Sequence, residues 1–220
     1  MIGDKLIIDE YHHAAADMVL AYLDKLKPDM PYSISISGES GSGKSEIAQV
    51  LMKGLVARGN KVMVLGQDDY FKLPPHSNHQ HRNKDISWVG PREVKLDLMN
   101  NHTQKLFSNN GEMVVKPLVH FAQDKIGTEN LAGPYDIVIA EGTYTSLLEN
   151  ISFRIFIDRD YHETKKHRLS RNRDQALEDN EDQDLKFLEK VLEIEHKIIS
   201  KHKNLADLVI PPPQVLLKTK

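Results

Sequence analysis

Apolar residues in the first part of the chain recur with two different periods, one helical and one extended. Helical spacing from Tyr11 to Leu26 predicts an amphipathic helix within a peripheral segment, residues 1–31. Alternation over Tyr32–Ser37 and a short apolar run over Lys61–Leu65 predict two strands. Between the two strands, the apolar positions from Lys44 to Arg58 return to helical spacing. The first third of the chain therefore reads as helix, strand, helix and strand.

The carboxyl-terminal half continues this alternation. The apolar run Tyr135–Gly142 predicts a buried strand that ends in a carboxylate, Glu141, and Phe153–Ile157 predicts a strand that ends at Asp158. Strands that alternate with helices imply an α/β fold with a parallel sheet covered by helices on both faces. The other expected elements are a basic helix over Tyr161–Leu177, a helix over Asp184–Lys201 and a strand over Leu208–Ile210.

The middle of the chain has a weaker pattern. Residues Lys72–Val89 are rich in Pro, His and Asn and show no period, which predicts a long surface segment. Val94–Phe107 has helical spacing, and Glu112–Lys116 predicts an edge strand that ends at Pro117. Because long connecting segments often carry function, we expect a substrate flap over approximately residues 72–130.

Composition adds limits to this picture. A chain of 220 residues with 40% hydrophobic and 28% charged residues is expected to form a single domain spanning residues 1–220. Its net charge of −3 argues against nucleic acid and anionic membranes as partners. The absence of cysteine excludes disulfide and thiol chemistry and fits a reducing compartment. No secretion signal or long apolar segment is seen, so a cytoplasmic location is expected.

The strongest chemical motif is the octet Gly38-Glu39-Ser40-Gly41-Ser42-Gly43-Lys44-Ser45, which has the spacing G-x-x-x-x-G-K-S. Its glycines allow successive backbone N–H groups to face phosphate oxygens at a helix N-terminus. Lys44 would reach the β- and γ-phosphates of ATP, and the Ser45 hydroxyl would bind Mg²⁺. A flexible Gly/Ser turn without a ligand is the other interpretation, but the strand before the octet and the helix after it favour a phosphate-binding loop.

Carboxylates at the ends of two predicted strands extend the motif. Glu141 ends the clearest buried strand, where an acidic group can help hold the metal. Asp68 and Asp69 follow the other strand. Phosphoryl transfer to an alcohol needs a carboxylate that accepts or orients the hydroxyl proton. We assign this role to Asp68, although the sequence alone also allows Asp69.

These motifs together resemble the uridine kinase and phosphoribulokinase family. The matching segments occur in the order typical of that family and cover roughly residues 32–211. They are the octet, Gln67-Asp68-Asp69-Tyr70-Phe71, Glu141-Gly142, Phe156-Ile157-Asp158-Arg159-Asp160 and Ala206-Asp207-Leu208-Val209-Ile210-Pro211.

The resemblance implies a three-layer P-loop fold with a five-stranded parallel core and ATP-dependent phosphorylation of a hydroxyl. By position, Asp68 matches the catalytic aspartate of the family. The basic helix matches its lid, over approximately residues 161–183, so Arg168, Arg171 and Arg173 would close on the phosphates. Arginine suits that role because its guanidinium group binds phosphate oxygens through two parallel hydrogen bonds.

The acceptor is less well specified. Uridine kinases usually have a Tyr-Asp-Phe segment followed by a histidine and an arginine, where this chain has Val119-His120-Phe121 and then Asp124-Lys125-Ile126. A uridine- or cytidine-like nucleoside leads the interpretation, and the segment after Gln67 is also similar to nicotinamide riboside kinases. Sugar or sugar-phosphate acceptors stay open. The candidate acceptor contacts are Asp69, Tyr70, Phe71 and His120.

Other features are open to interpretation as chemistry. His76, His79 and His81 could suggest a metal site, but surface histidines in a polar segment are the simpler explanation. Trp88 is interpreted as a packing residue rather than a stacking platform. A nucleotide-binding switch and an inactive relative remain as rival functions. The choice between ATP and GTP and the formation of a homo-oligomer are also left open.

Overall fold

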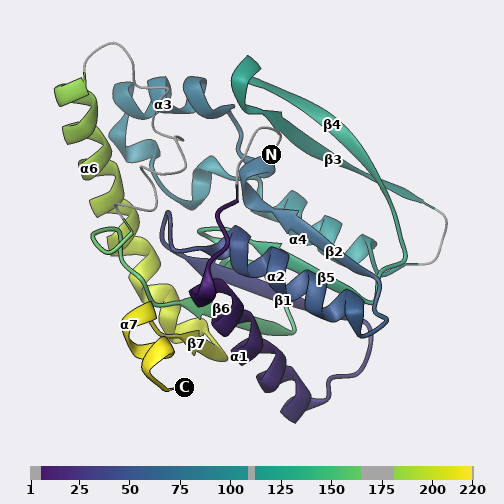
Figure 1. The fold of residues 1–220 in the computed structure, drawn as a ribbon. Coiled ribbons are helices and arrows are strands. Elements are labelled where there is room, and N and C mark those ends of the chain that lie inside the picture. The colour runs from purple at the N-terminus through teal and green to yellow at the C-terminus, as the bar shows by residue number, and fades with distance from the viewer. Residues whose placement is uncertain (1–5, 109–111, 165–180, 220) are drawn as a thin grey trace.

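The computed structural model of the protein describes residues 6–108, 112–164 and 181–219. Its centre is a five-stranded parallel sheet with the strand order β2-β5-β1-β6-β7 (Figure 1). The strand Tyr32–Gly38, predicted from the sequence as a strand over Tyr32–Ser37, lies in the middle of the sheet and leads into the octet. The strands are β1 (Tyr32–Gly38), β2 (Val62–Gly66), β5 (Ile137–Glu141), β6 (Phe153–Ile157) and β7 (Leu208–Ile210).

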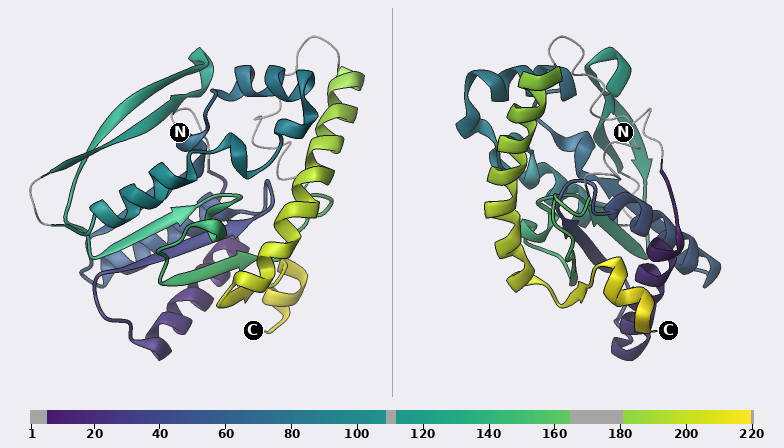
Figure 2. Two further views of the ribbon diagram at one scale, coloured as in Figure 1. Left: turned by 180° about the vertical axis from the view of Figure 1, so that it is seen from behind. Right: turned by 60° about the vertical axis from the view of Figure 1, so that its left-hand side comes forward.

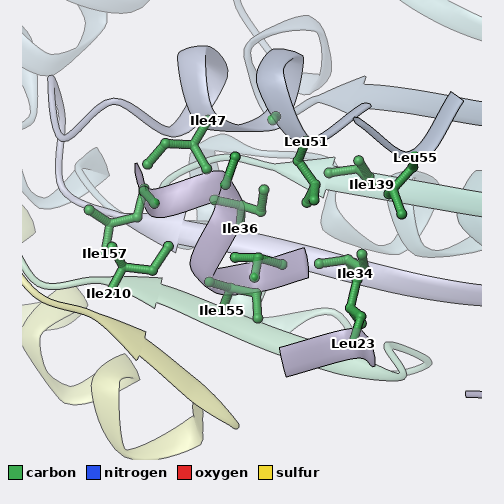
Figure 3. Packing of buried hydrophobic residues seen from close by; sticks show 14 of the residues in the cluster. Leu23, Ile34, Ile36, Ile47, Leu51, Leu55, Ile139, Ile155, Ile157 and Ile210 are labelled. Carbon is green, nitrogen blue, oxygen red and sulfur yellow. The ribbon is translucent and has the colours of Figure 1, made fainter. Parts of the chain in front are cut away.

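One face of the sheet is covered by the first two helices, α1 (Glu10–Leu26) and α2 (Lys44–Ala57). Isoleucines at alternate strand positions point to this face, and Leu51 of α2 packs on them without solvent exposure (Figure 3). β-Branched residues suit these positions because they pack well on the pleated surface of a sheet. The isoleucines are Ile34, Ile36, Ile137, Ile139, Ile155, Ile157 and Ile210.

The opposite face carries a second core. Val138 and Ala140, which alternate with the isoleucines of β5, pack with α4 (Leu96–Lys105) and with the carboxyl-terminal end of α6 (Glu181–Ile199). Figure 2 shows α6 extending from the level of α3 (Pro75–Lys84) down to the sheet and the short helix α7 (Pro213–Leu216). The fold is therefore three-layered α/β, as expected. No helix among the described residues is long and apolar enough to cross a membrane.

The expected flap region contains more structure than predicted. Residues Pro75–Lys84 form a helix, α3, although they carry no apolar period. A distant residue caps this helix: Asp124 accepts hydrogen bonds from the backbone N–H groups of His76 and Ser77, at 2.7 and 3.1 Å. A helix N-terminus that is capped in this way does not need a continuous apolar stripe to begin.

The prediction that a strand would end at Pro117 was also wrong. Strand β3 (Met113–His120) continues through Pro117 and pairs antiparallel with β4 (Lys125–Ala132) in a separate two-stranded sheet. Both strands of such a hairpin are edge strands, and proline is tolerated at an edge because its missing N–H need not face a partner.

At the carboxyl-terminal side, α6 begins at Glu181, three residues before the predicted start. The predicted basic helix Tyr161–Leu177 and the lid arginines Arg168, Arg171 and Arg173 lie largely or wholly in residues 165–180, outside the described part of the chain. Residues 161–164, which are described, form a turn.

Candidate active site

The octet forms a loop that connects the end of β1 to the start of α2. Gly41 and Gly43 have φ angles of 75° and 97°, a region that side chains rarely occupy. Lys44, the first residue of α2, is buried and donates a hydrogen bond of 2.7 Å to the carbonyl oxygen of Glu39. The lysine thus closes the loop around the N-terminus of α2, where backbone N–H groups and the helix dipole favour phosphate.

Glu141 and Ser45 lie together beside this loop. The Ser45 hydroxyl donates to a carboxylate oxygen of Glu141 at 3.2 Å. Register explains the approach, because Glu141 is paired with Ile36 of β1 on one side and with Gly66 of β2 on the other. A Cβ atom added to Gly66 would lie 3.1 Å from the Glu141 carboxylate, so the glycine leaves the space that the carboxylate needs.

This pair fits Mg²⁺ in its usual protein environment. Mg²⁺ commonly takes one or two protein oxygens, with substrate phosphates and waters completing its octahedron. Ser45 and Glu141 supply a hydroxyl and a carboxylate at the N-terminus of α2. Across residues 6–108, 112–164 and 181–219, no cluster of three or more His, Cys, Asp and Glu side chains offers a complete metal cage. Such a cluster is likewise not formed by His76, His79 and His81.

Asp68 and Asp69 have different surroundings. Asp69 is 3% exposed, and its carboxylate accepts hydrogen bonds from Lys116 Nζ at 2.8 Å and from the Val119 N–H at 2.9 Å. Both donors belong to β3. Asp68 is only half-buried and lines two cavities. Asp69 therefore connects the hairpin to the end of β2 and lines only the second of these cavities, whereas Asp68 lines both.

The first of these cavities, the Phe71–Phe121 cavity, has a volume of about 190 Å³. Asp68 lies on its wall together with the two phenylalanines, and Asn78 and Arg82 of α3 complete the polar part. Its walls are thus mainly apolar with a few polar groups, which is typical of small-molecule sites.

The second, the Ser45–Glu141 cavity, measures about 380 Å³ and also includes Asp68 and Lys116. It adjoins the N-terminus of α2 through Ser45. Asp68 is the charged residue that both cavities share in the described part of the chain. The carboxylate at the end of β2 therefore stands between an apolar space and the phosphate-binding loop.

Two of the expected acceptor contacts point elsewhere in the structure. Tyr70 has no solvent exposure and lies in the second core, where its hydroxyl and His102 Nδ1 are hydrogen-bonded at 3.0 Å. Burial raises the pKa of Tyr70, so the hydroxyl keeps its proton in this contact. His120 contacts Gly127 across the hairpin rather than the cavity wall. Phe71, by contrast, does line the cavity.

A buried charge cluster behind the Phe71–Phe121 cavity was not predicted. Arg82 donates two hydrogen bonds to Glu93, at 2.7 and 3.0 Å, and a third to Glu195 of α6 at 3.1 Å. The two carboxylates raise the pKa of Arg82 against the opposing effect of burial, whereas burial raises the pKa of Glu195. These residues lie far apart in the sequence, and neither motif nor periodicity relates them.

The far side of the octet is joined to α6 as well. One carboxylate oxygen of Glu39 lies 2.6 Å from His196 Nδ1, and the other accepts the Tyr161 N–H at 2.8 Å. Desolvation raises the pKa of Glu39, and the contact with His196 opposes that rise. A cavity of about 430 Å³, the Glu39 cavity, opens here and includes Arg159 and Pro212.

Trp88 is held by its neighbours, as predicted for a packing residue. Its indole N–H donates to the Asn78 side chain at 2.9 Å, and the cations of Lys72 and Arg92 lie over its ring at 5.8 and 5.6 Å. The ring therefore braces α3 from outside the Phe71–Phe121 cavity, whose wall includes Asn78.

The chain was compared with known proteins. The model of the "Phosphoribulokinase / Uridine kinase family" matches residues 33–216. A uridine kinase from Staphylococcus epidermidis is 28% identical over 183 residues, which cover 81% of this chain and 86% of that protein. The phosphoribulokinase from Rhodobacter spheroides has a TM-score of 0.61 at 10% identity, covering 82% of this chain and 69% of its own. The D-glycerate 3-kinase from Cryptococcus neoformans also has a TM-score of 0.61, at 13% identity, and the match covers 88% of this chain and 90% of that protein. The structural likenesses show the fold, and the extent of the family match shows that the chain belongs to the phosphoribulokinase and uridine kinase family of P-loop kinases.

Proposed function

We propose that the protein transfers the γ-phosphate of ATP to a hydroxyl group of a small molecule, namely a nucleoside such as uridine or cytidine. The observation that carries this proposal is the position of Asp68. It is shared by the Phe71–Phe121 cavity and the Ser45–Glu141 cavity, so a hydroxyl bound beside it could reach a phosphate held by the octet. In-line transfer depends on bringing these two groups together.

Each residue of the site has a distinct role in this proposal. Asp68 accepts the proton of the attacking hydroxyl, while Lys44 and the octet N–H groups stabilise the charge on the phosphates. Ser45 and Glu141 hold Mg²⁺, which when bound neutralises charge on the phosphate oxygens. Asp69, bonded to Lys116 and the Val119 N–H, holds Asp68 in place and is not the base. Lid closure by Arg168, Arg171 and Arg173 remains part of the proposal, outside the described residues.

The Phe71–Phe121 cavity supports an acceptor with a flat ring. Aromatic side chains favour stacked or edge contacts with such a ring, and Asn78 offers both a donor and an acceptor. Arg82 is already bonded to Glu93 and Glu195, so its cation is not available to neutralise an anionic acceptor. This charge pattern favours a neutral nucleoside or a cationic riboside, such as nicotinamide riboside, over a sugar phosphate or a carboxylate.

The nucleoside part of ATP would lie over the Glu39 cavity. The sheet order places β6 and β7 on the side of β1 away from β2, and the residues that follow these two strands, including Arg159 and Pro212, line that cavity. The acceptor and the ATP base would then approach the octet from opposite sides.

An acceptor screen tests the proposal. Purified protein with MgATP is incubated with uridine, cytidine, nicotinamide riboside, uridine monophosphate, glycerate and free sugars, and ADP release is measured against an Asp68→Asn control. We expect turnover with at least one neutral or cationic riboside and none above control with the anionic compounds. ADP release that is independent of any acceptor and unchanged in Asp68→Asn would favour a nucleotide-binding switch and contradict the proposal.

A further inference from the structure

Helix α1 lies outside the segment that matches the family model, residues 33–216, and yet it reaches the phosphate-binding loop. His12, in the first turn of α1, has no solvent exposure. A Cβ atom built on Gly43 would lie 2.7 Å from His12 Nε2 and 2.9 Å from its Cδ2. The imidazole ring therefore occupies the space directly against the backbone of the last glycine in the octet.

The neighbouring residue of α1 supports the same part of the loop through an arginine. The guanidinium of Arg159 lies over the Tyr11 ring at 5.0 Å and donates a hydrogen bond of 3.2 Å to the carbonyl oxygen of Ser42. The Tyr11 hydroxyl in turn donates to the carbonyl oxygen of Pro211 at 3.3 Å. The rings of Tyr11 and His12 meet edge to face, with centroids 5.5 Å apart. His12 thus contacts Gly43 directly, and its neighbour Tyr11 supports Ser42 through Arg159.

The N-terminal cap of α1 fixes the orientation of the His12 ring. Asp9 is the N-cap of α1, and its side chain accepts the His12 N–H while its own N–H donates to His12 Nδ1 at 3.0 Å. This reciprocal arrangement holds the imidazole at one orientation, with Nδ1 toward the helix end and the other edge toward Gly43. Rotation of the ring away from the loop would break the bond to the Asp9 N–H.

The contact matters because glycine can adopt many backbone conformations at little cost. Glycine at a φ of 97° can leave that region at little steric cost, and rotation of its peptide groups would turn the loop N–H groups away from a phosphate. A ring packed against one side of Gly43 and a guanidinium bonded to the Ser42 carbonyl both oppose such rotation. Preorganised N–H donors bind anions better than donors that must be ordered during binding.

We propose that Tyr11 and His12 are positioning residues for nucleotide binding, which hold the Ser42–Gly43 peptide in its phosphate-binding orientation. The proposal rests on the proposed function only in taking ATP as the ligand. It assigns to α1 a role in the site that the family match, beginning after this helix, does not cover.

Variants of His12 test the direct contact. His12→Gln keeps a side chain that can accept the Asp9 N–H, as in an ordinary capping box, but removes the ring from Gly43. Val19→Ala is the matched control, since Val19 is equally buried in α1 and lies about two turns further along the helix. Calorimetric titration with MgATP in the absence of any acceptor gives the dissociation constant, and thermal unfolding gives the stability of each variant.

We expect His12→Gln to raise the dissociation constant for MgATP roughly tenfold, because a small displacement of binding groups has large effects. Val19→Ala should lower the unfolding temperature and leave the dissociation constant within about twofold of wild type. Affinity unchanged in His12→Gln, or reduced to the same extent in Val19→Ala, would overturn the proposal.

Tyr11 provides an independent pair. Tyr11→Phe keeps the aromatic face under Arg159, whereas Tyr11→Leu keeps a smaller apolar side chain without that face. The proposal expects weaker MgATP binding in Tyr11→Leu and near-normal binding in Tyr11→Phe; equal affinities would count against it. MgATP binding by wild type without turnover in the acceptor screen would contradict the proposed function alone. Absence of MgATP binding by wild type would overturn both.

Discussion

At the scale of single residues, Asp68 and Asp69 are neighbours in the chain with different tasks. Replacing Asp68 by Asn keeps the shape of the side chain and removes the proton acceptor, so kcat should fall by a factor on the order of 100 to 10,000. MgATP affinity should change little, because Asp68 is not part of the octet. Steady-state kinetics with the best acceptor and calorimetry with MgATP measure the two effects. A variant that kept most of its kcat would exclude Asp68 as the base.

Asp69 and Lys116 form a nearly dry ion pair, with side chains 4% and 6% exposed. Lys116→Met removes the cation beside a buried carboxylate and leaves its hydrogen bond from the Val119 N–H in place, so we expect a loss of about 3–5 kcal/mol in unfolding free energy. The double variant Asp69→Asn, Lys116→Met should recover part of that loss. Urea unfolding of the two single variants and the double variant measures the coupling. Additive effects of the two substitutions would show that the pair does not act as a unit.

At the scale of elements, α3 is the part of the fold on which the Phe71–Phe121 cavity depends, because Pro75, Asn78 and Arg82 line it. Asp124 caps α3 through two backbone N–H groups and also accepts the Ser77 hydroxyl at 2.6 Å. Asp124→Ala should therefore cost about 1–2 kcal/mol of stability and raise the KM of the acceptor. The KM of MgATP should not change.

The exposed aspartate of α4, Asp97, supplies the control for this prediction. Asp97→Ala removes an acidic residue from the first turn of a different helix, which does not line the cavity. We expect its effect on the acceptor KM to be negligible. If Asp124→Ala raised the KM of MgATP as much as that of the acceptor, the cap would not be acting through the cavity.

The elements also show which parts of the fold were predictable. Strands such as β5 were recognisable because a run of apolar residues buried on both faces gives a continuous signal. Helix α3 was missed because contacts distant in the sequence support it, among them the cap by Asp124, which lies more than 40 residues further along the chain. The strand through Pro117 was predicted too short because proline was expected to end even an edge strand, whereas β3 stays paired with β4 through Pro117.

The candidate site divides in the same way. The octet and Glu141 belong to local motifs, and Asp68 follows a strand, so each could be proposed as a site residue from the sequence. The contacts of Arg82 with Glu195 and of Glu39 with His196 join residues 113 and 157 positions apart. No periodicity or short motif relates side chains over such distances. The same limit hid the tertiary role of Asp69, which accepts hydrogen bonds from Lys116 and Val119 in the hairpin.

At the scale of the whole molecule, the parallel sheet brings the site together. All five strands run in one direction, so the residues that follow β1, β2, β5, β6 and β7 meet at one edge. The two cores on either side of the sheet fix that edge, and α6 spans it by contacting both Arg82 and Glu39. The stability of the cores and the geometry of the site are therefore linked. Conditions that destabilise a core should also disturb the geometry of the site.

Low pH is such a condition, because two buried histidines, His102 and His202, lie on the same side of the sheet as the second core. Burial lowers the pKa of His102, which is hydrogen-bonded to the Tyr70 hydroxyl, and of His202, which packs against the Tyr144 ring. As pH falls through the ordinary histidine pKa of about 6.5, the unfolded chain takes up protons that the folded state refuses. The contribution of these two histidines to the unfolding free energy is therefore fully present above that pH and is lost as the pH falls below it.

The slope should reach at most about 1.4 kcal/mol per pH unit for each histidine. Glu39 and Glu195 act in the opposite sense, because burial raises their pKa and their folded forms bind protons more readily as pH falls toward 4.5. The effect of histidine must therefore be measured by difference. Urea unfolding of wild type, His102→Asn, His202→Asn and the exposed control His13→Asn between about pH 7.5 and 5.5 gives that difference. We expect the unfolding free energies of wild type and His13→Asn to fall in parallel as the pH is lowered. The unfolding free energies of His102→Asn and His202→Asn should fall less, since asparagine takes up no proton. If all four proteins lost the same unfolding free energy over this pH range, neither histidine would be kept neutral by the fold.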